Sequence, residues 1–493
     1  MRLLRNIYEK YEKKSTRLVL FFLLGAISSL CVAILYNNNI ISYDSSYQYA
    51  ATHLSFEEMI RAIPNDYTPP LYYLCAYFVK ICFGESLTVY RAINIVAHFG
   101  ILYLLLFPAQ EILTKKQNVS TVFFFFFSDL YIMYYSETRN TYLAQFFTTA
   151  MIVYGLCAYK TPRFKNYFLT FLYSALALYT HNFCIAVYAA SYILFVLFSF
   201  KEKQYKKMAG FLIAGTAGVL AYLPWMTLLF AQISSVHENY WHNEVGSNMW
   251  MLLEAFKIYI VALVLFFIEN KTTDKRKAQK FNDIEKITIY AVLLTFMIYK
   301  VISFGMGGIE AVRYYSILGT ISFMAASVLA GKVKSKEYLV AIYLVSAVFF
   351  IRQYAKCAIG RAGSEIPEML EFIEEKENIV FFHAHEYTLG VMMYYFPDAK
   401  HYIDDDFFTV LNDLSVFPSE VNHISDLGCL KGQTDSFFYI VPNVETGIYK
   451  VILDDYKRKI ENLYNIDIQE QYRMYTSYDS YFDYITVYEV HTH

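Results

Sequence analysis

Charged residues are scarce in this chain: they make up 17% of its 493 residues, whereas about a quarter is usual in soluble domains. The formal net charge is only −2, and no basic tail is present. This composition argues against an ordinary globular, a disordered or a nucleic-acid-binding protein. Hydrophobic residues reach 56% instead, and apolar runs of about twenty residues recur over the first 355 positions. These runs identify a polytopic membrane protein.

Cysteine is also sparse and unpatterned. The seven cysteines are scattered, mostly inside apolar runs, and none has metal-ligand spacing. They imply no disulfide framework, although Cys357 and Cys429 are both available in the C-terminal region. His383 and His385 alternate on a predicted strand, which is too few ligands to predict a metal site.

Length and hydropathy predict eleven membrane spans. The predicted spans cover residues 18–36, 88–107, 119–135, 140–159, 166–181, 182–200, 208–231, 250–268, 284–303, 312–331 and 337–355. The first follows six basic residues and lacks a small-residue cleavage site, which predicts an uncleaved anchor with a cytoplasmic N-terminus.

The distribution of lysine and arginine supports this count. With the first span running outward, every connection predicted to be cytoplasmic is rich in lysine or arginine, and the outer connections hold almost none. One apolar segment, Pro69–Phe83, is too short to cross and would reverse all later loops if it did. We therefore interpret it as a helix lying at the outer interface.

The chain divides into two parts. Residues 1–356 form the predicted α-helical membrane domain, with Glu254 and Lys257 spaced to pair on one face of its eighth span. Residues 357–493 regain charge and alternate short apolar runs with a helical segment, which predicts a small α/β domain outside the cytoplasm. The absence of organelle retrieval signals and the short loops favour a bacterial plasma membrane.

Polar residues are costly at membrane depth, so those at the outer ends of spans carry information. The outer connections hold Asp44, His53, Glu58, Tyr67, Tyr72, Arg91, Glu137, Arg139, Tyr142, His181, Asn182, Arg313 and Tyr314. Arginines on one face suit a cleft that grips an anionic lipid head group, since their guanidinium groups fork onto phosphate oxygens. A carboxylate such as Asp44 can accept a proton beside it.

Some of these residues are also compatible with purely structural roles. Position alone is compatible with Glu137 and Arg139 forming a solvated helix cap, and with Tyr72 belonging to an interfacial aromatic belt. His181 is compatible with a packing role. Arg313 is harder to explain structurally, because so few basic residues face outward.

Several short motifs resemble one known family when they are taken in order. They are an acid shortly after the first span, Pro69-Pro70-Leu71-Tyr72-Tyr73, Phe83-Gly84-Glu85-Ser86, Arg91, Ser136-Glu137-Thr138-Arg139, Tyr179-Thr180-His181, Leu223-Pro224-Trp225 and Arg313-Tyr314. Over residues 18–330 this set resembles the glycosyltransferase family 39-like members of the GT-C superfamily. Two departures occur: Ser45 follows Asp44 where the family often has a second acid, and Thr141 replaces a common tyrosine, with Tyr142 next to it.

The resemblance implies an inverting transferase that moves a sugar from a polyprenyl-phosphate donor to a cell-envelope acceptor on the outer face. It implies catalytic roles for Asp44, as general base, and for Glu137. It implies donor-phosphate contacts from four further residues, Arg91, Arg139, Arg313 and Tyr72. The remaining candidates for substrate binding are His53, Glu58, Tyr67, Tyr142, His181, Asn182 and Tyr314. It also implies that neither a nucleotide sugar, a cofactor nor a divalent metal is needed.

Two other functions remain open from the sequence. A transporter or flippase for lipid-linked saccharides often shows paired, interrupted segments in two related halves, which are not evident here. A polysaccharide polymerase or ligase would share the outer-face chemistry but use diphosphate-linked donors. The partners expected in each case are lipid-linked saccharides and membrane lipid, and no nucleic acid.

Overall fold

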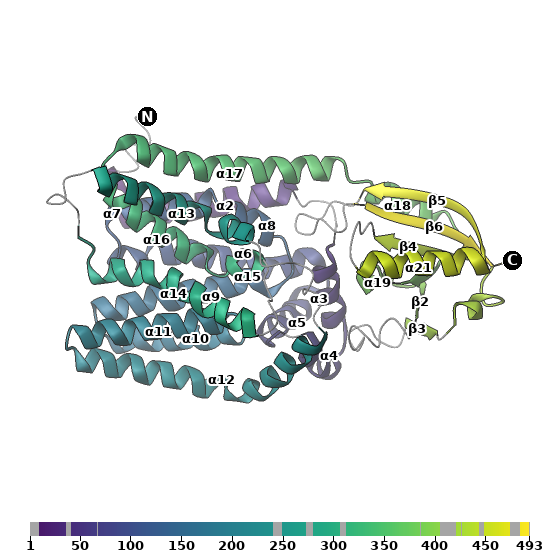
Figure 1. The fold of residues 1–493 in the computed structure, drawn as a ribbon, viewed down its shortest axis with the longest axis horizontal. Coiled ribbons are helices and arrows are strands. Elements are labelled where there is room, and N and C mark those ends of the chain that lie inside the picture. The colour runs from purple at the N-terminus through teal and green to yellow at the C-terminus, as the bar shows by residue number, and fades with distance from the viewer. Residues whose placement is uncertain are drawn as a thin grey trace.

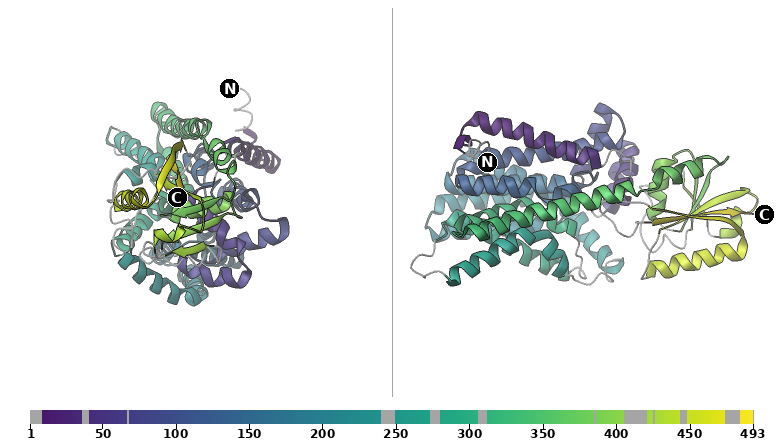
Figure 2. Two further views of the ribbon diagram at one scale, coloured as in Figure 1. Left: turned by 90° about the vertical axis from the view of Figure 1, so that its right-hand side faces the viewer. Right: turned by 90° about the horizontal axis from the view of Figure 1, so that it is seen from above.

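The computed structural model of the chain shows a long helical bundle with a smaller α/β domain at one end (Figure 1). It describes residues 9–35, 41–66, 68–239, 249–272, 280–305, 312–384, 386–404, 421–424, 426–442, 448–473 and 484–492. The N-terminal segment and the C-terminal domain lie at opposite ends of the bundle (Figure 2). We call the C-terminal α/β domain the outer domain.

The bundle helices coincide with the predicted spans. They are α2 (Lys14–Leu35), α6 (Leu87–Leu106), α7 (Lys115–Phe126), α8 (Asp129–Tyr134), α9 (Asn140–Lys160), α10 (Phe164–Leu178), α11 (Cys184–Lys201), α12 (Tyr205–Asn239), α13 (Met249–Thr272), α14 (Asp283–Gly305), α15 (Val312–Ser316), α16 (Gly319–Lys332) and α17 (Lys336–Ala362). Within the described residues, seven helices are long and apolar enough to cross a membrane: α2, α6, α9, α11, α12, α14 and α17. The chain is thus a multi-pass membrane protein, as predicted.

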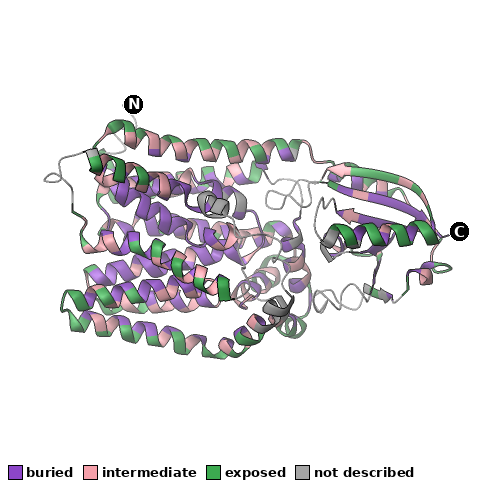
Figure 3. Cartoon of the chain, viewed as in Figure 1, coloured by how far each residue is buried: buried purple, intermediate pink, exposed green. Residues whose placement is uncertain are grey.

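Burial distinguishes central from peripheral helices. In the most apolar 18-residue stretch of α9, 89% of the residues are buried, whereas in that of α17 only 11% are buried. Figure 3 shows the same contrast along the bundle. A helix that is apolar all round and buried belongs to a core, while α17 presents apolar side chains such as Val348 and Ile351 outward. These outward faces are suited to lipid contact.

The lysine-rich connections gather at the end of the bundle far from the outer domain. Lys115 lies 3.9 Å from Glu12, near the N-terminus. Lys160, at the end of α9, donates to the carbonyl of Glu111 in the short 3-10 helix η2 (Pro108–Glu111). The described lysines Lys115 and Lys160 of the connections predicted to be cytoplasmic therefore lie at one end, as the charge distribution predicts.

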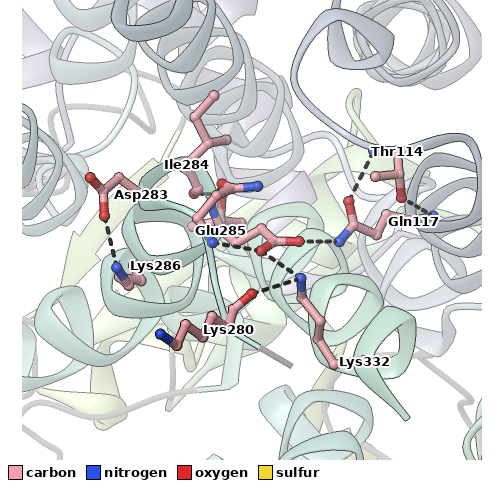
Figure 4. A network of polar contacts seen from close by, with 10 residues as sticks. Thr114, Gln117, Lys280, Asp283, Ile284, Glu285, Lys286 and Lys332 are labelled. Atoms are coloured by element: carbon pink, nitrogen blue, oxygen red, sulfur yellow. Dashed lines mark hydrogen bonds and ion pairs between the residues drawn. The ribbon is translucent and has the colours of Figure 1, made fainter. Parts of the chain in front are cut away.

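A buried carboxylate connects three helices at this end (Figure 4). Glu285 of α14 accepts a hydrogen bond of 2.7 Å from Gln117 of α7 and forms an ion pair of 2.8 Å with Lys332 of α16. The backbone amide of Asn282 also donates to it at 2.9 Å. Because burying a charge is costly unless it is paired and hydrogen-bonded, these contacts explain why Glu285 is tolerated there.

Two of the predicted spans are each divided into two helices, and the sequence does not predict these breaks. The span at 119–135 separates into α7 and α8, and the span at 312–331 into α15 and α16. At the first break the carbonyl of Phe127 accepts a bond of 3.0 Å from Ser346 of α17, and Asp129 pairs with Lys257 of α13. Irregular backbone is tolerated at membrane depth where protein groups satisfy it in this way. The ion-pair partner found for Lys257 is thus Asp129, while the side chain of Glu254 lies outside the described residues.

Short helices cover the end of the bundle next to the outer domain. They are α3 (Tyr43–His53), α4 (Phe56–Ala62), the 3-10 helix η1 (Ile63–Asp66) and α5 (Leu71–Phe83). The 13 residues of α5 are too few to cross a bilayer, and its Phe78, Ile81 and Phe83 are exposed. The segment predicted as an interfacial helix thus forms a short apolar helix at the expected end.

The outer domain is built on a six-stranded sheet of order β3-β2-β1-β4-β6-β5. Its elements are α18 (Ile366–Glu374), β1 (Val380–His383), α19 (Glu386–Tyr395), β2 (Lys400–Asp404), β3 (Val421–Ile424), η6 (Leu427–Leu430), β4 (Ser436–Pro442), α21 (Ile448–Leu463), β5 (Asn465–Arg473) and β6 (Tyr484–His491). Strands β3, β2, β1 and β4 are parallel, and β6 and β5 add in antiparallel fashion. The α/β prediction for this region is confirmed. Cys357 and Cys429 are both free thiols.

Two buried histidines connect the parallel strands to α19. His383 Nε2 lies 3.0 Å from His401 Nδ1, and His401 Nε2 lies 3.1 Å from the carbonyl oxygen of Phe396. Because that carbonyl only accepts, His401 carries its proton on Nε2 and accepts the proton of His383 through Nδ1. His383 Nδ1 then accepts from the hydroxyl of Thr388 at 3.0 Å. All four ring nitrogens of the two histidines therefore take part in hydrogen bonds when both rings are neutral.

We predict that Glu285→Ala destabilises the protein by about 2 kcal/mol, because the buried side-chain amide of Gln117 and the half-buried ammonium of Lys332 both lose a charged partner. The measurement is the thermal unfolding midpoint in detergent. Asp283→Ala is the matched control, since its pair with Lys286 is more exposed and contributes less than about 1 kcal/mol. Equal effects of the two variants would contradict the role given to Glu285.

Acid should destabilise the outer domain. Burial lowers the pKa of His401 to about 4, and burial followed by the charge of His401 lowers the pKa of His383 well below its ordinary value. A folded-state pKa below the unfolded value of about 6.5 means that the stability is complete above that pH and declines as the pH falls towards 4.

Hydrogen exchange of β1 and β2 across this pH range measures the effect. His383→Gln should flatten the decline, while His491→Gln, a change at an exposed histidine in the same domain, should leave it as in the wild type. A decline that is unchanged by His383→Gln would exclude the histidine pair as its cause.

Candidate functional site

One carboxylate and two arginines meet at the end of the bundle that faces the outer domain. Asp44 Oδ1 lies 3.2 Å from Arg139 Nη2, and Asp44 Oδ2 lies 2.5 Å from Arg313 Nη1. The three residues come from the start of α3, the start of α9 and the short helix α15. The structure thus brings together three residues that the sequence identified separately.

Local structure explains how each group is presented. Ser42 is the N-cap of α3, and its hydroxyl accepts from the amide of Ser45 at 3.2 Å, so Asp44 lies in the first turn, where a negative charge is favoured. Arg139 is the N-cap of α9, and a cation at that end of a helix is unfavourable. Its pairing with Asp44 offsets this cost. Arg313 reaches the same carboxylate from the first turn of α15, the short helix that precedes the break before α16.

These charges are partly open to the outside. The side-chain exposures are 11% for Asp44, 18% for Arg139 and 21% for Arg313. Two guanidinium groups thus share one carboxylate. Because guanidinium groups bind phosphate and carboxylate oxygens in forked geometry, this site is suited to an anionic ligand.

Glu137 lies next to this group and is differently held. One of its oxygens accepts from the hydroxyls of Ser42 at 2.5 Å and Ser45 at 2.8 Å. Burial raises the pKa of Glu137 and the charge of Asp44 adds to the rise, although the two serine bonds and the positive charge of Arg91 oppose it. Glu137 therefore connects α3 to the segment before α9, in a site that favours its protonated form more than water does.

Arg91 and Asn94 of α6 hold the backbone around Glu137. Arg91 Nε donates to the carbonyl of Ser136 at 2.9 Å, and the side-chain amide of Asn94 donates to the carbonyl of Tyr135 at 3.2 Å and to that of Glu137. These bonds fix the turn that presents Glu137. Arg91 therefore supports the backbone next to Glu137, and its charge acts on that carboxyl group.

Tyr72 of α5 contributes a buried hydroxyl with no hydrogen-bond partner among the described residues. Burial raises its pKa, and the charges of Arg139, Glu137 and Arg91 also act on it, so its ring lies in the field of the site. A buried hydroxyl normally finds a partner. Its unpaired state suits a position that a bound polar ligand completes.

The segment between α10 and α11 places His181 close to the two arginines. Burial lowers the pKa of His181 to about 3, and the charges of Arg313 and Arg139 contribute, so the ring is neutral at pH 7. It lies edge-on to Tyr314 at 5.5 Å, and the guanidinium of Arg313 lies 5.2 Å from the centre of the Tyr314 ring. Asn182 accepts from the hydroxyl of Tyr222 at 3.2 Å. His181 and Tyr314 thus border the arginine pair.

Other predicted residues point elsewhere. The hydroxyl of Tyr142 contacts His98 Nδ1 at 2.7 Å inside the bundle. His53 is exposed and lies 3.0 Å from Glu85. Glu58 forms the capping box of α4 with Ser55 on the exposed surface. Tyr67 lies outside the described residues. Among the described residues no three potential metal ligands lie together, and metal independence stays a prediction.

The sequence interpretation missed the residues that hold the charged groups in place. Ser42 and Ser45 bind Glu137, and the ring of Tyr47 lies 5.8 Å from the guanidinium of Arg139. The serines carried a usable signal, because a serine directly before a helical run is a preferred N-cap. Tyr47 carried none, since its role depends on α3 packing beside the start of α9.

No family model matches the sequence, and no curated protein matches it. ArnT from Cupriavidus metallidurans, solved bound to undecaprenyl phosphate, is similar in structure with a TM-score of 0.58 and 10% identity, over 96% of this chain and 98% of ArnT. Its apo structure gives a TM-score of 0.59 with 10% identity over 95% and 97%. An Archaeoglobus fulgidus oligosaccharyltransferase gives a TM-score of 0.47 with 12% identity over 75% and 61%.

The two ArnT matches define the fold. The chain has the fold of ArnT, with the membrane bundle and the outer domain both included in the match, which agrees with the GT-C-type fold that its ordered motifs predicted. At 10% identity the match concerns the course of the chain. The role of each side chain must therefore be argued from the site itself.

We predict opposite effects of two changes at Glu137. A carboxyl whose folded-state pKa is raised supports the fold fully below its unfolded pKa and loses that support as the pH rises. Glu137→Gln removes this titration and keeps an oxygen for the two serines, so its thermal unfolding midpoint at pH 8 should equal or exceed that of the wild type. Glu137→Ala should cost about 1–2 kcal/mol, because both hydroxyls lose their acceptor. A lower midpoint for Glu137→Gln than for Glu137→Ala would contradict this account.

Proposed function

We propose that this protein is a glycosyltransferase that moves a sugar from a polyprenyl-phosphate donor to an acceptor hydroxyl. The observation that carries the proposal is the pairing of Asp44 with two partly exposed arginines, Arg139 and Arg313, at one end of a membrane bundle. Such a site supplies both a proton acceptor and a binding position for a lipid phosphate. The GT-C fold supports the same class of reaction.

The charge balance suggests how the donor is received. Asp44 bonds both guanidinium groups. A donor phosphate brings its own oxygens to the arginines and so competes with this carboxylate. When the arginines turn to the phosphate, an oxygen of Asp44 becomes available to the acceptor. Donor binding therefore releases the base at the moment it is needed.

The reaction then follows with balanced bonds. The acceptor oxygen attacks the anomeric carbon of the sugar while its proton passes to Asp44. The bond between that carbon and the phosphate oxygen breaks, and polyprenyl phosphate leaves with the electron pair. Arg139 and Arg313 stabilise the charge that develops on the phosphate, because preorganised donors in a water-poor site act strongly on such charge. Direct displacement of this kind inverts the anomeric centre.

The position of the site suggests where the reaction occurs. The site lies at the end of the bundle opposite the lysine-rich connections, and the positive-inside rule assigns such connections to the cytoplasm. We therefore propose that the sugar is transferred on the outer face of a bacterial plasma membrane, to an acceptor of the cell envelope. The undecaprenyl phosphate bound in ArnT supports a donor of the same lipid class here.

The first experiment measures donor turnover by the purified protein in detergent. Short-chain polyprenyl monophosphate sugars are offered with candidate acceptors, and released polyprenyl phosphate is quantified. Asp44→Asn should lower turnover at least about 100-fold, because it removes the base and keeps the shape. Asp467→Asn, at an exposed carboxylate of the outer domain, is the matched control and should behave as the wild type.

A binding measurement with undecaprenyl phosphate separates the base from the arginines. Arg313→Gln should weaken binding about tenfold, whereas Asp44→Asn should bind at least as tightly as the wild type, since the competing carboxylate is gone. Turnover that survives Asp44→Asn would reject the base. Turnover only with diphosphate-linked donors would favour a polymerase or ligase, and movement of an intact lipid-linked saccharide across the membrane would favour a flippase.

A further inference from the structure

The outer domain meets the membrane domain through helix α19, which packs against α3 (Figure 1). One side of α19 belongs to the outer domain: Leu389 and Met392 are fully buried in its hydrophobic clusters. Thr388 of α19 is also bonded to His383 of the central strand β1. Helix α19 is thus fixed to the sheet, and the surface that it presents to α3 moves with the outer domain.

Two adjacent tyrosines in the last turn of α19 contact the residue before α3 and the second half of α3. The hydroxyl of Tyr395 accepts a hydrogen bond of 3.4 Å from the backbone amide of Ile41. The ring of Tyr394 lies edge-on to Tyr49 of α3 at 5.0 Å, and Tyr49 lies edge-on to Tyr90 of α6 at 5.9 Å. Ile41 is itself fully buried within a cluster of outer-domain side chains.

The segment held in this way leads directly into the site. Ile41 precedes Ser42, which caps α3 and donates to Glu137, and Asp44 lies in the first turn that follows. A helical turn moves as a unit, because its backbone hydrogen bonds fix successive residues relative to one another. The position of Ile41, together with the Ser42 and Ser45 bonds to Glu137, therefore contributes to where the carboxylate of Asp44 lies relative to the two arginines.

The two ends of α3 are held by different parts of the molecule. At its C-terminal end, Lys80 of α5 donates to the carbonyls of Thr52 at 2.7 Å and His53 at 2.9 Å. At its N-terminal end, Ser42 and Ser45 bond Glu137 of the membrane domain, and the outer domain holds Ile41 just before the helix. Loss of the outer-domain contact removes one of these two restraints, and it loosens the turn that carries Asp44 more than the residues near Lys80.

We propose that Tyr394 and Tyr395 of the outer domain are positioning residues for Asp44, so that the membrane-embedded site is complete only when the outer domain is docked on α3. This proposal rests on the proposed function, because it gives the outer domain a part in the same reaction. The tyrosines act through α3 and contact neither the donor nor the acceptor.

The test compares hydrogen exchange in the first turn of α3 in the full-length protein in detergent. Tyr395→Phe removes the acceptor of the Ile41 amide and keeps the ring, and Tyr394→Ala removes the contact with Tyr49. Each should raise exchange over residues 41–46 about fivefold, the size of effect that one hydrogen bond produces. Tyr402→Phe is the matched control, since its hydroxyl bonds Gln433 inside the outer domain at 2.9 Å, and it should leave this exchange unchanged.

A second readout is the split between kcat and KM in the transfer assay. Tyr395→Phe should lower kcat about fivefold without raising KM for the polyprenyl-phosphate donor, because the arginines keep their positions and a displaced Asp44 competes no better for them. Unchanged exchange in both tyrosine variants, an equal effect of Tyr402→Phe, or raised exchange with unchanged kcat would overturn the proposal. The exchange measurement needs no turnover, so an inactive wild-type protein would count against the proposed function and leave this test readable.

Discussion

The ion pairs between Asp44 and the arginines Arg139 and Arg313 are the interaction on which the site depends. They join segments that lie 95 and 269 positions apart in the chain. Charges near the end of an apolar bundle are expensive unless they are paired. The fold of the bundle therefore has to bring three elements together: the start of α3, the N-cap of α9 and the short helix α15.

The spans were predictable because membrane thickness fixes their length and charge fixes their order. The breaks within them were not. The run Phe123–Phe127 is uniformly apolar, and nothing in it distinguishes a continuous helix from one that ends at Phe126 and restarts at Asp129. The break is stabilised by Ser346 and Lys257, which come from helices much later in the chain. A local pattern carries no information about such partners.

The candidate site was predictable to a similar extent. Asp44, Arg139 and Arg313 stand out in the sequence because charges facing the outer side are rare, and the structure brings them together. Tyr142 shows that the direction of a side chain could not be predicted in the same way. Successive residues on a helix point about 100° apart, so a tyrosine one position further along α9 than in the related motif faces the bundle interior and His98. Sequence proximity indicated the right turn of the helix, but the direction of the side chain follows from packing.

The wide separation of these residues along the chain has a consequence for biosynthesis. Ribosomes deliver the chain from its N-terminus, and domains of large proteins form as they are made. Asp44 and Arg139 reach the membrane early, whereas Arg313 and the α19 tyrosines arrive only with the last two fifths of the chain. Until then Asp44 lacks one of its counter-charges and α3 lacks its outer contact. A partly made protein therefore has spans that cross the membrane before the cluster of Asp44, Arg139 and Arg313 can form.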